Sequence, residues 1–233
     1  MIEKIILFSG ASSVGKTAVM KTLIPLLKQR DLTTCICKID CIHTEDEKVY
    51  KKLNVKCVTG LSQDICPDHY LVSNLPELWK WADQEGGDWL LVETAGLCHR
   101  CSPATELMLS GCVLDATASY RAPESFGPML SQADFIVLTK IDMVSQAEKE
   151  ILMWNIKKLN IGARLFPVDG LSGYGVETLM EWLYKVPARE SFENDTLRHT
   201  MPCGVCSYCV GETRVGSMFQ QGIVGKIDFG EVR

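Results

Sequence analysis

The segment GASSVGKT, residues 10–17, constrains the fold of this chain more than any other feature of the sequence. It satisfies the eight-residue phosphate-loop (P-loop) pattern, it follows an apolar run typical of a strand, and a helical segment follows it directly. Small residues allow successive backbone N–H groups to close around phosphate oxygens at the start of that helix. The motif therefore predicts a nucleotide-binding α/β domain.

Two side chains of this loop have a predicted chemical role. Lys16 is expected to neutralise the terminal phosphates and to act in catalysis, and the hydroxyl of Thr17 is expected to bind Mg²⁺. Further residues expected to contact the nucleotide are Gly10, Ser12, Ser13, Val14, Gly15 and Ala18.

Apolar runs of strand length alternate with helical segments along most of the chain. Continuous apolar strands belong to a sheet covered on both faces, so we expect a three-layer, doubly wound and mainly parallel α/β fold. The expected strands are 4–9, 34–39, 89–92, 112–115, 135–139 and 164–168. The expected helices are 16–28, 75–83, 146–158 and 176–185.

The 233 residues leave room for one large domain and a small appendage. The pattern breaks down after Pro187, so we predict a nucleotide-binding domain at 1–186 and a Cys-rich extension at 187–233. A formal charge of −5 with scattered Lys and Arg argues against nucleic acid as a partner. No apolar run is long enough to span a membrane and no cleavable signal pattern is visible, so we expect a cytoplasmic protein.

Two later segments indicate the base of the nucleotide. TKID, residues 139–142, is the kind of sequence with which a GTPase reads guanine: Asp142 would accept from the guanine N1 and N2 donors and Lys140 would lie over the base. DGLSGYG, residues 169–175, is typical of a second base loop, in which Asp169, Gly170 and Leu171 would lie beside the guanine. We therefore expect GTP in preference to ATP.

Two carboxylates end strands close to the P-loop. Asp40 ends TCICKID and Glu93 ends DWLLVE. Mg²⁺ and the activation of water require carboxylates at such positions. We assign Asp40 to Mg²⁺ and to the attacking water, and Glu93 to the second shell of Mg²⁺ or to sensing of the γ-phosphate.

Eleven cysteines is a high number for a chain expected in a reducing compartment, where thiols are buried, bind metals or act in redox chemistry. We interpret Cys35, Cys37, Cys57 and Cys112 as packing residues because they lie in apolar runs. The remaining thiols are candidates for metal binding.

The order of motifs resembles the nickel-inserting GTPases of hydrogenase and urease maturation, the HypB/UreG type within the CobW/HypB/UreG superfamily, across about residues 4–185. The resemblance rests on GASSVGKT, KID followed by HTEDE, TGLSQDICPDH, ETAGLCHRCSP, VLDA, TKID and SGYGVETLMEWL. It implies a SIMIBI-like P-loop fold and GTP hydrolysis. It also implies a homodimer that depends on nucleotide or metal, and release of a metal ion into a client enzyme or its maturation factor.

The metal motif departs from the urease type, which has Cys, Pro and His in succession. Here Asp68 separates Cys66 and Pro67 from His69. One inserted residue either preserves the ligand pair or moves His69 to another face, and both alternatives stay open. A thiolate with an imidazole suits Ni²⁺ or Zn²⁺, and two copies across a twofold axis would complete a four-ligand site.

Two further groups of cysteines have the spacing of ligands. Cys98 and Cys101 form CHRC after the Glu93 turn, where a symmetric dimer would offer four thiolates, enough for a [4Fe–4S] cluster. The alternative is a pair of reactive or packing thiols. The tail presents CxxCxxC, with His199 upstream as one possible additional ligand. Its three thiols are those of Cys203, Cys206 and Cys209.

These features together predict a metallochaperone or metallocofactor-maturation GTPase that delivers a metal ion or cluster on hydrolysis. Two other classes remain open. One is an iron–sulfur ATPase in which the nucleotide gates electron or cluster transfer. The other is a regulatory GTPase with structural zinc.

Overall fold

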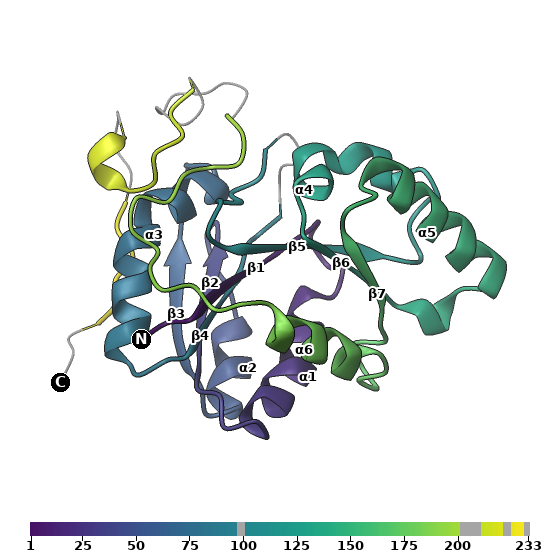
Figure 1. Ribbon diagram of the computed structural model, residues 1–233, viewed down its shortest axis with the longest axis horizontal. Coiled ribbons are helices and arrows are strands. Elements are labelled where there is room, and N and C mark those ends of the chain that lie inside the picture. Colours follow the sequence, from purple (N-terminus) through teal and green to yellow (C-terminus); the bar gives the residue numbers. More distant parts are fainter. Residues whose placement is uncertain (97–100, 201–210, 221–224, 231–233) are drawn as a thin grey trace.

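A computed structural model of the chain describes residues 1–96, 101–200, 211–220 and 225–230. Its centre is a seven-stranded sheet of order β3-β2-β4-β1-β5-β6-β7 (Figure 1), and every neighbouring pair of strands is parallel. The strands are β1 (Lys4–Ser9), β2 (Thr34–Asp40), β3 (Lys56–Leu61), β4 (Trp89–Glu93), β5 (Leu109–Asp115), β6 (Phe135–Thr139) and β7 (Arg164–Pro167). The expected doubly wound parallel fold is confirmed.

Helices cover both faces of the sheet. The α-helices are α1 (Lys16–Lys28), α2 (Asp46–Lys52), α3 (Pro67–Gln84), α4 (Gly127–Ser131), α5 (Gln146–Leu159) and α6 (Val176–Lys185). The 3-10 helices are η1 (Ala122–Phe126), η2 (Ile141–Met143) and η4 (Ser217–Phe219). In Figure 1, α1, α2 and α6 lie together below the sheet.

Alternation along each strand divides the core between the two faces. On β1, Ile6 and Phe8 pack in one cluster with side chains of α1, α2 and α6. Ile5 and Leu7 point the other way, into a cluster with α3. Side chains of α4 and α5 bury the corresponding face of β5 and β6. The three layers follow from the two-residue period of a strand buried on both sides.

Strand β3, helices α2 and α4 and the short 3-10 helices were not expected from the sequence, and α3 is longer than expected. In β3 only Val58 and Gly60 are buried, so this edge strand lacks an apolar run, and α2 is short and buries only Tyr50. Helix α3 begins at Pro67 rather than Leu75 because its first turns are buried on all sides and therefore have no amphipathic period. The thiols of Cys35, Cys37 and Cys112 are buried and Cys57 is half-buried, as packing residues should be.

The described parts of the C-terminal extension pack onto the nucleotide-binding domain. Phe192 and Ile227 join the core cluster beneath α3, and Leu197 forms an isolated antiparallel bridge with Thr105. Arg198 makes the most extensive contact, since its guanidinium donates to both carboxylate oxygens of Asp134 and to three backbone carbonyls. The boundary at residue 187 stays a prediction.

None of the helices in the described ranges combines the length and the apolar character needed to cross a bilayer.

The contacts of Arg198 predict that Arg198→Met lowers the free energy of unfolding by about 2–3 kcal/mol, because a charged carboxylate and three carbonyls lose their donor. Urea denaturation of the purified variant measures this. Arg214→Met is the matched control: Arg214 lies in the same extension, but its guanidinium, paired with Glu212, is largely exposed, so a much smaller loss is expected. Equal losses in the two variants would contradict a clamping role for Arg198.

Candidate functional site

The carboxyl ends of the parallel strands bring the predicted nucleotide residues to one edge of the sheet. The P-loop follows β1, Asp40 ends β2 and Glu93 ends β4, the strand that lies between β1 and β2. Lys140 follows β6 on the other side of the P-loop. Open α/β sheets bind their ligands at this edge.

The P-loop has the backbone geometry that phosphate binding requires. Gly10, Ser13 and Gly15 have positive φ angles of 139°, 62° and 97°, and Gly15 immediately precedes α1. The buried amine of Lys16 donates to the carbonyls of Gly10 at 2.8 Å and Ala11 at 2.7 Å. Burial lowers the pKa of Lys16 to about 8, although Glu93 opposes this shift. A phosphate would give this amine an anionic partner in place of two carbonyls.

A buried carboxylate lies directly behind the predicted magnesium ligand. Glu93 is 1% exposed, and it accepts hydrogen bonds from the hydroxyl of Thr17 at 2.7 Å, the amine of Lys38 at 2.8 Å and the hydroxyl of Tyr50 at 2.5 Å. Burial works against the charge on Lys38, but Glu93 and Asp46 outweigh it and raise the pKa of Lys38. Glu93 therefore holds the side chain of Thr17 in place.

Two more carboxylates approach the same point. Asp46, the first residue of α2, lies 2.8 Å from the amine of Lys38 and 3.4 Å from the hydroxyl of Thr17. Asp40 lies farther out, with its carboxylate 4.0 Å from the amine of Lys38, and it accepts a hydrogen bond from the backbone N–H of Cys41 at 2.8 Å. The structure thus brings Glu93 and Asp46 to the Thr17 hydroxyl and places Asp40 beside Lys38.

Reasoning from the sequence missed Lys38, Tyr50 and Asp46. Lys38 faces Glu93 in register across the parallel β2–β4 pair, so a correct strand order would have indicated the contact. Tyr50 and Asp46 lie on α2, which was not predicted. The cluster of acids in HTEDE was the available signal for Asp46.

The first base loop is anchored to the P-loop. Lys140 has a left-handed φ of 55°, and its amine donates to the carbonyl of Ser13 at 3.1 Å and forms an ion pair with Asp115. Thr139 donates its hydroxyl to the carbonyl of Val14 at 2.5 Å. Asp142 is exposed in the short helix η2. A carboxylate in this position is accessible to a base.

The conformation of the second base loop is held by hydrogen bonds to its first residue, Asp169. The carboxylate of Asp169 accepts from the backbone N–H groups of Leu171 at 2.9 Å and Ser172 at 3.2 Å. A hydrogen bond from the Ser172 side chain, with these backbone bonds, lowers the pKa of Asp169. A Cβ built on Gly170 would lie 3.2 Å from the Cβ of Ala18, so this loop touches the start of α1. Both base loops therefore adjoin the P-loop.

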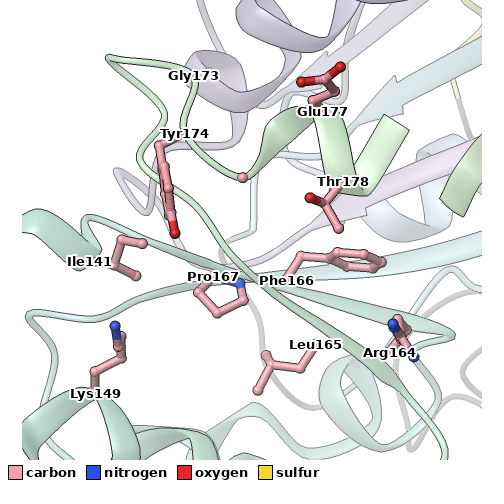
Figure 2. A pocket seen from close by; sticks show the side chains of 11 residues that line it. Ile141, Lys149, Arg164, Leu165, Phe166, Pro167, Gly173, Tyr174, Glu177 and Thr178 are labelled. Atoms are coloured by element: carbon pink, nitrogen blue, oxygen red, sulfur yellow. The ribbon is translucent and has the colours of Figure 1, made fainter. Parts of the chain in front are cut away.

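A cavity of about 540 Å³ adjoins both base loops but does not include the predicted base ligands. Ile141 of the first loop and Tyr174 of the second line one side of the cavity, and Phe166 and Pro167 of the edge strand β7 line another (Figure 2). The cavity therefore lies beside the predicted guanine site and is separate from it.

The most informative feature outside the nucleotide site is a cluster of metal-ligand atoms. Cys66 precedes the first residue of α3 and His69 lies in the first turn, while Cys101 comes from the segment that follows Glu93. The ligand atoms of these three residues all lie within 4.8 Å of one another. The inserted Asp68 therefore keeps Cys66 and His69 together, and Cys101 joins them from a different part of the chain.

The surroundings of these side chains favour the forms that bind metals. A hydrogen bond with Cys101 lowers the pKa of Cys66 to about 5 against the effect of burial, and His69 and the backbone amides of the first turn of α3 add to this. Burial lowers the pKa of His69, which keeps the imidazole neutral. A thiolate and a neutral imidazole are the states in which Cys and His bind transition metals.

The other predicted thiol ligands, Cys98, Cys203, Cys206 and Cys209, lie outside the described residues. His199 is described. Its Nε2 accepts from the backbone N–H of Ser102 at 3.1 Å and its Nδ1 lies 2.8 Å from the carbonyl of Thr200. The C-terminal extension therefore reaches the residue next to Cys101.

Comparison with known proteins identifies the class. Residues 4–167 match the family described as CobW/HypB/UreG, nucleotide-binding domain. The chain is 40% identical over 225 residues to an uncharacterized protein of Methanocaldococcus jannaschii, covering 97% of this chain and 96% of that one. It is 29% identical over 191 residues to the urease accessory protein UreG of Photorhabdus laumondii, covering 76% and 90%.

Two solved structures share the fold. The hydrogenase maturation factor HypB of Archaeoglobus fulgidus superimposes with a TM-score of 0.65 and 20% identity, over 79% of this chain and 90% of that one. HypB of Helicobacter pylori, solved in complex with nickel, gives a TM-score of 0.66 and 17% identity, over 82% and 92%. This chain belongs to the CobW/HypB/UreG family of P-loop nucleotide-binding proteins, as the motifs predicted.

The buried position of Glu93 predicts that Lys38→Met lowers the free energy of unfolding by about 3–5 kcal/mol, because a buried carboxylate loses its cation. Urea denaturation without nucleotide measures the change. Lys48→Met, which removes an exposed ion pair with Glu45 from α2, should cost about 1 kcal/mol or less. A similar small loss in Lys38→Met would mean that Glu93 does not need Lys38 for its charge.

Proposed function

We propose that this protein is a GTP-hydrolysing metallochaperone that binds a transition-metal ion at Cys66, His69 and Cys101 and releases it to a client metalloenzyme or its maturation factor. The observation that carries the proposal is the approach of these three ligand atoms to within 4.8 Å. Two thiolates with one imidazole suit Zn²⁺ or Ni²⁺, and the site is built at the same edge of the sheet as the nucleotide site.

A short segment connects the two sites. Glu93 accepts from the hydroxyl of Thr17, and the chain then runs through Gly96 towards Cys101. Gly96 has a φ of 69°, and a Cβ built on it would lie 1.7 Å from the carbonyl oxygen of Gly10, so this turn rests on the P-loop backbone. A phosphate that reorganises the P-loop would act on Gly96, five residues before Cys101, which supports coupling of nucleotide state to metal binding.

The nucleotide chemistry is assigned to the residues around the P-loop. Lys16 would neutralise the terminal phosphates, and Thr17 and Asp40 would bind Mg²⁺. Glu93 would orient Thr17 and respond to the γ-phosphate. Lys140 and Asp142 would select guanine, and the backbone of the loop that begins at Asp169 would face the guanine oxygen.

Assembly and location complete the proposal. The relatives named as accessory and maturation factors support action on a partner protein. We propose a cytoplasmic homodimer whose formation depends on nucleotide or metal.

Lys16→Ala should abolish hydrolysis of GTP, because the terminal phosphates lose their buried cation, and it should leave the nucleotide-free affinity for Ni²⁺ unchanged. Phosphate release and equilibrium dialysis measure the two properties. In the unsubstituted protein a non-hydrolysable GTP analogue should change the affinity for Ni²⁺ about 5–150-fold. Full turnover by Lys16→Ala would overturn the assignment of the P-loop.

Cys66→Ser should lower the affinity for Ni²⁺ by at least about tenfold, because a hydroxyl replaces the thiolate that Cys101 and the start of α3 stabilise. Slow basal hydrolysis of GTP should continue. Cys41→Ser is the control, since Cys41 follows Asp40 at the same edge of the sheet but is not part of the cluster. Equal affinities in both variants would contradict the proposed metal site.

A further inference from the structure

Asp68 is a buried carboxylate whose surroundings are unusual. The residue is 4% exposed, and the one hydrogen bond recorded for its side chain comes from the thiol of Cys101, at 3.5 Å. No ion pair joins it to a Lys, Arg or His of the described residues, although the charge of the Lys16 amine acts on it. A carboxylate removed from water normally requires a cation or several donors, and the Cys101 thiol that donates to Asp68 belongs to the cluster of metal-ligand atoms.

The separation of Asp68 and Cys101 fits that of two ligands on one ion. Zinc–sulfur bonds of about 2.3 Å and zinc–oxygen bonds of about 2.0 Å at a tetrahedral angle place the two ligand atoms about 3.5 Å apart. The Oδ2 atom of Asp68 lies 3.5 Å from the Sγ atom of Cys101. The separation of these two atoms therefore matches that of two ligands on one ion.

We propose that Asp68 supplies a fourth ligand, so that a single chain binds one divalent transition-metal ion through Cys66, Asp68, His69 and Cys101. This inference rests on the metal site proposed above, and it replaces the expected four-ligand site shared between two chains. Asp68 is not one of the three residues whose ligand atoms lie within 4.8 Å of one another, so its carboxylate turns towards the ion on binding. The Cys101 proton leaves to solvent as the metal–sulfur bond forms, and no oxidant or reductant is needed.

The ligand set determines which ions the site accepts. Two thiolates, one imidazole and one carboxylate in tetrahedral geometry suit Zn²⁺ and Co²⁺. The oxygen ligand makes the site less suitable for Cu(I), which prefers thiolates and thioethers. Asp68 is thus a determinant of metal specificity as well as of affinity.

The test is a titration with Co²⁺, whose absorption reports both coordination geometry and thiolate ligation. The full chain is used without nucleotide, at a concentration where it is monomeric, with Cys203, Cys206 and Cys209 replaced by Ser. One Co²⁺ per chain with tetrahedral absorption is expected. Asp68→Asn should weaken binding by at least about tenfold, and Asp64→Asn, an exposed acid on the same connection, should not change it.

The variant Asp68→Cys tests ligation by a spectroscopic change that a loss of stability would not produce. If the side chain at position 68 reaches the ion, a third thiolate is added and the thiolate-to-cobalt charge-transfer absorption increases. Unchanged absorption in this variant, together with unchanged affinity in Asp68→Asn, would overturn the inference.

Two further outcomes separate this inference from the proposed function. Saturation at half a Co²⁺ per chain would show a site shared by two chains, and a loss of affinity in Cys98→Ser rather than Asp68→Asn would assign the fourth ligand to Cys98. Either result overturns the role of Asp68 and leaves the metallochaperone proposal intact. Absence of Co²⁺ and Ni²⁺ binding by the unsubstituted chain would overturn both.

Discussion

The carboxylate of Glu93 is the interaction on which the rest of the candidate site depends. It lies at the end of a central strand, is almost wholly buried, and binds donors from three other elements: Thr17 of α1, Lys38 of β2 and Tyr50 of α2. A buried charge is tolerated only with such compensation, so these elements are held in a fixed relation around it. The position of the Thr17 hydroxyl, and with it the predicted Mg²⁺ site, is a consequence of that requirement.

Much of this arrangement could be predicted from the sequence because it depends on local pattern. The P-loop, the apolar strands and the carboxylates at strand ends each have a signature within about ten residues, and the doubly wound topology then brings them to one edge. The contacts of Glu93 could not be predicted in this way. Lys38 has the appearance of an exposed strand residue, and its burial follows only from β4 being placed beside β2. Tyr50 lies on a helix too short to show periodicity.

The thiol cluster is a second case in which local sequence pattern could not predict a contact between distant parts of the chain. Spacing along the chain paired Cys98 with Cys101 and Cys66 with His69, because each pair lies within a few residues. The fold places Cys101 beside Cys66 and His69, which come from a distant part of the chain, and Cys98 lies outside the described residues. The inserted Asp68 gave cause for doubt about the His69 ligand in the sequence. In the structure the insertion occupies the first turn of α3, which returns His69 to the same side as Cys66.

Residues 93–96, which precede the segment that carries Cys101, have little freedom to move independently of the P-loop. Glu93 is fixed by the Thr17 hydroxyl, and Gly96 contacts the backbone of Gly10 so closely that no side chain could be present. A change in the P-loop on phosphate binding would therefore act on Gly96. Coupling free energy is reciprocal, so under the proposed coupling a metal ion that fixes Cys101 would bias the P-loop to the same extent. In a chain with such coupling, the affinity for the metal ion would differ between the nucleotide-bound and nucleotide-free forms. Directional delivery of a metal ion requires such a difference.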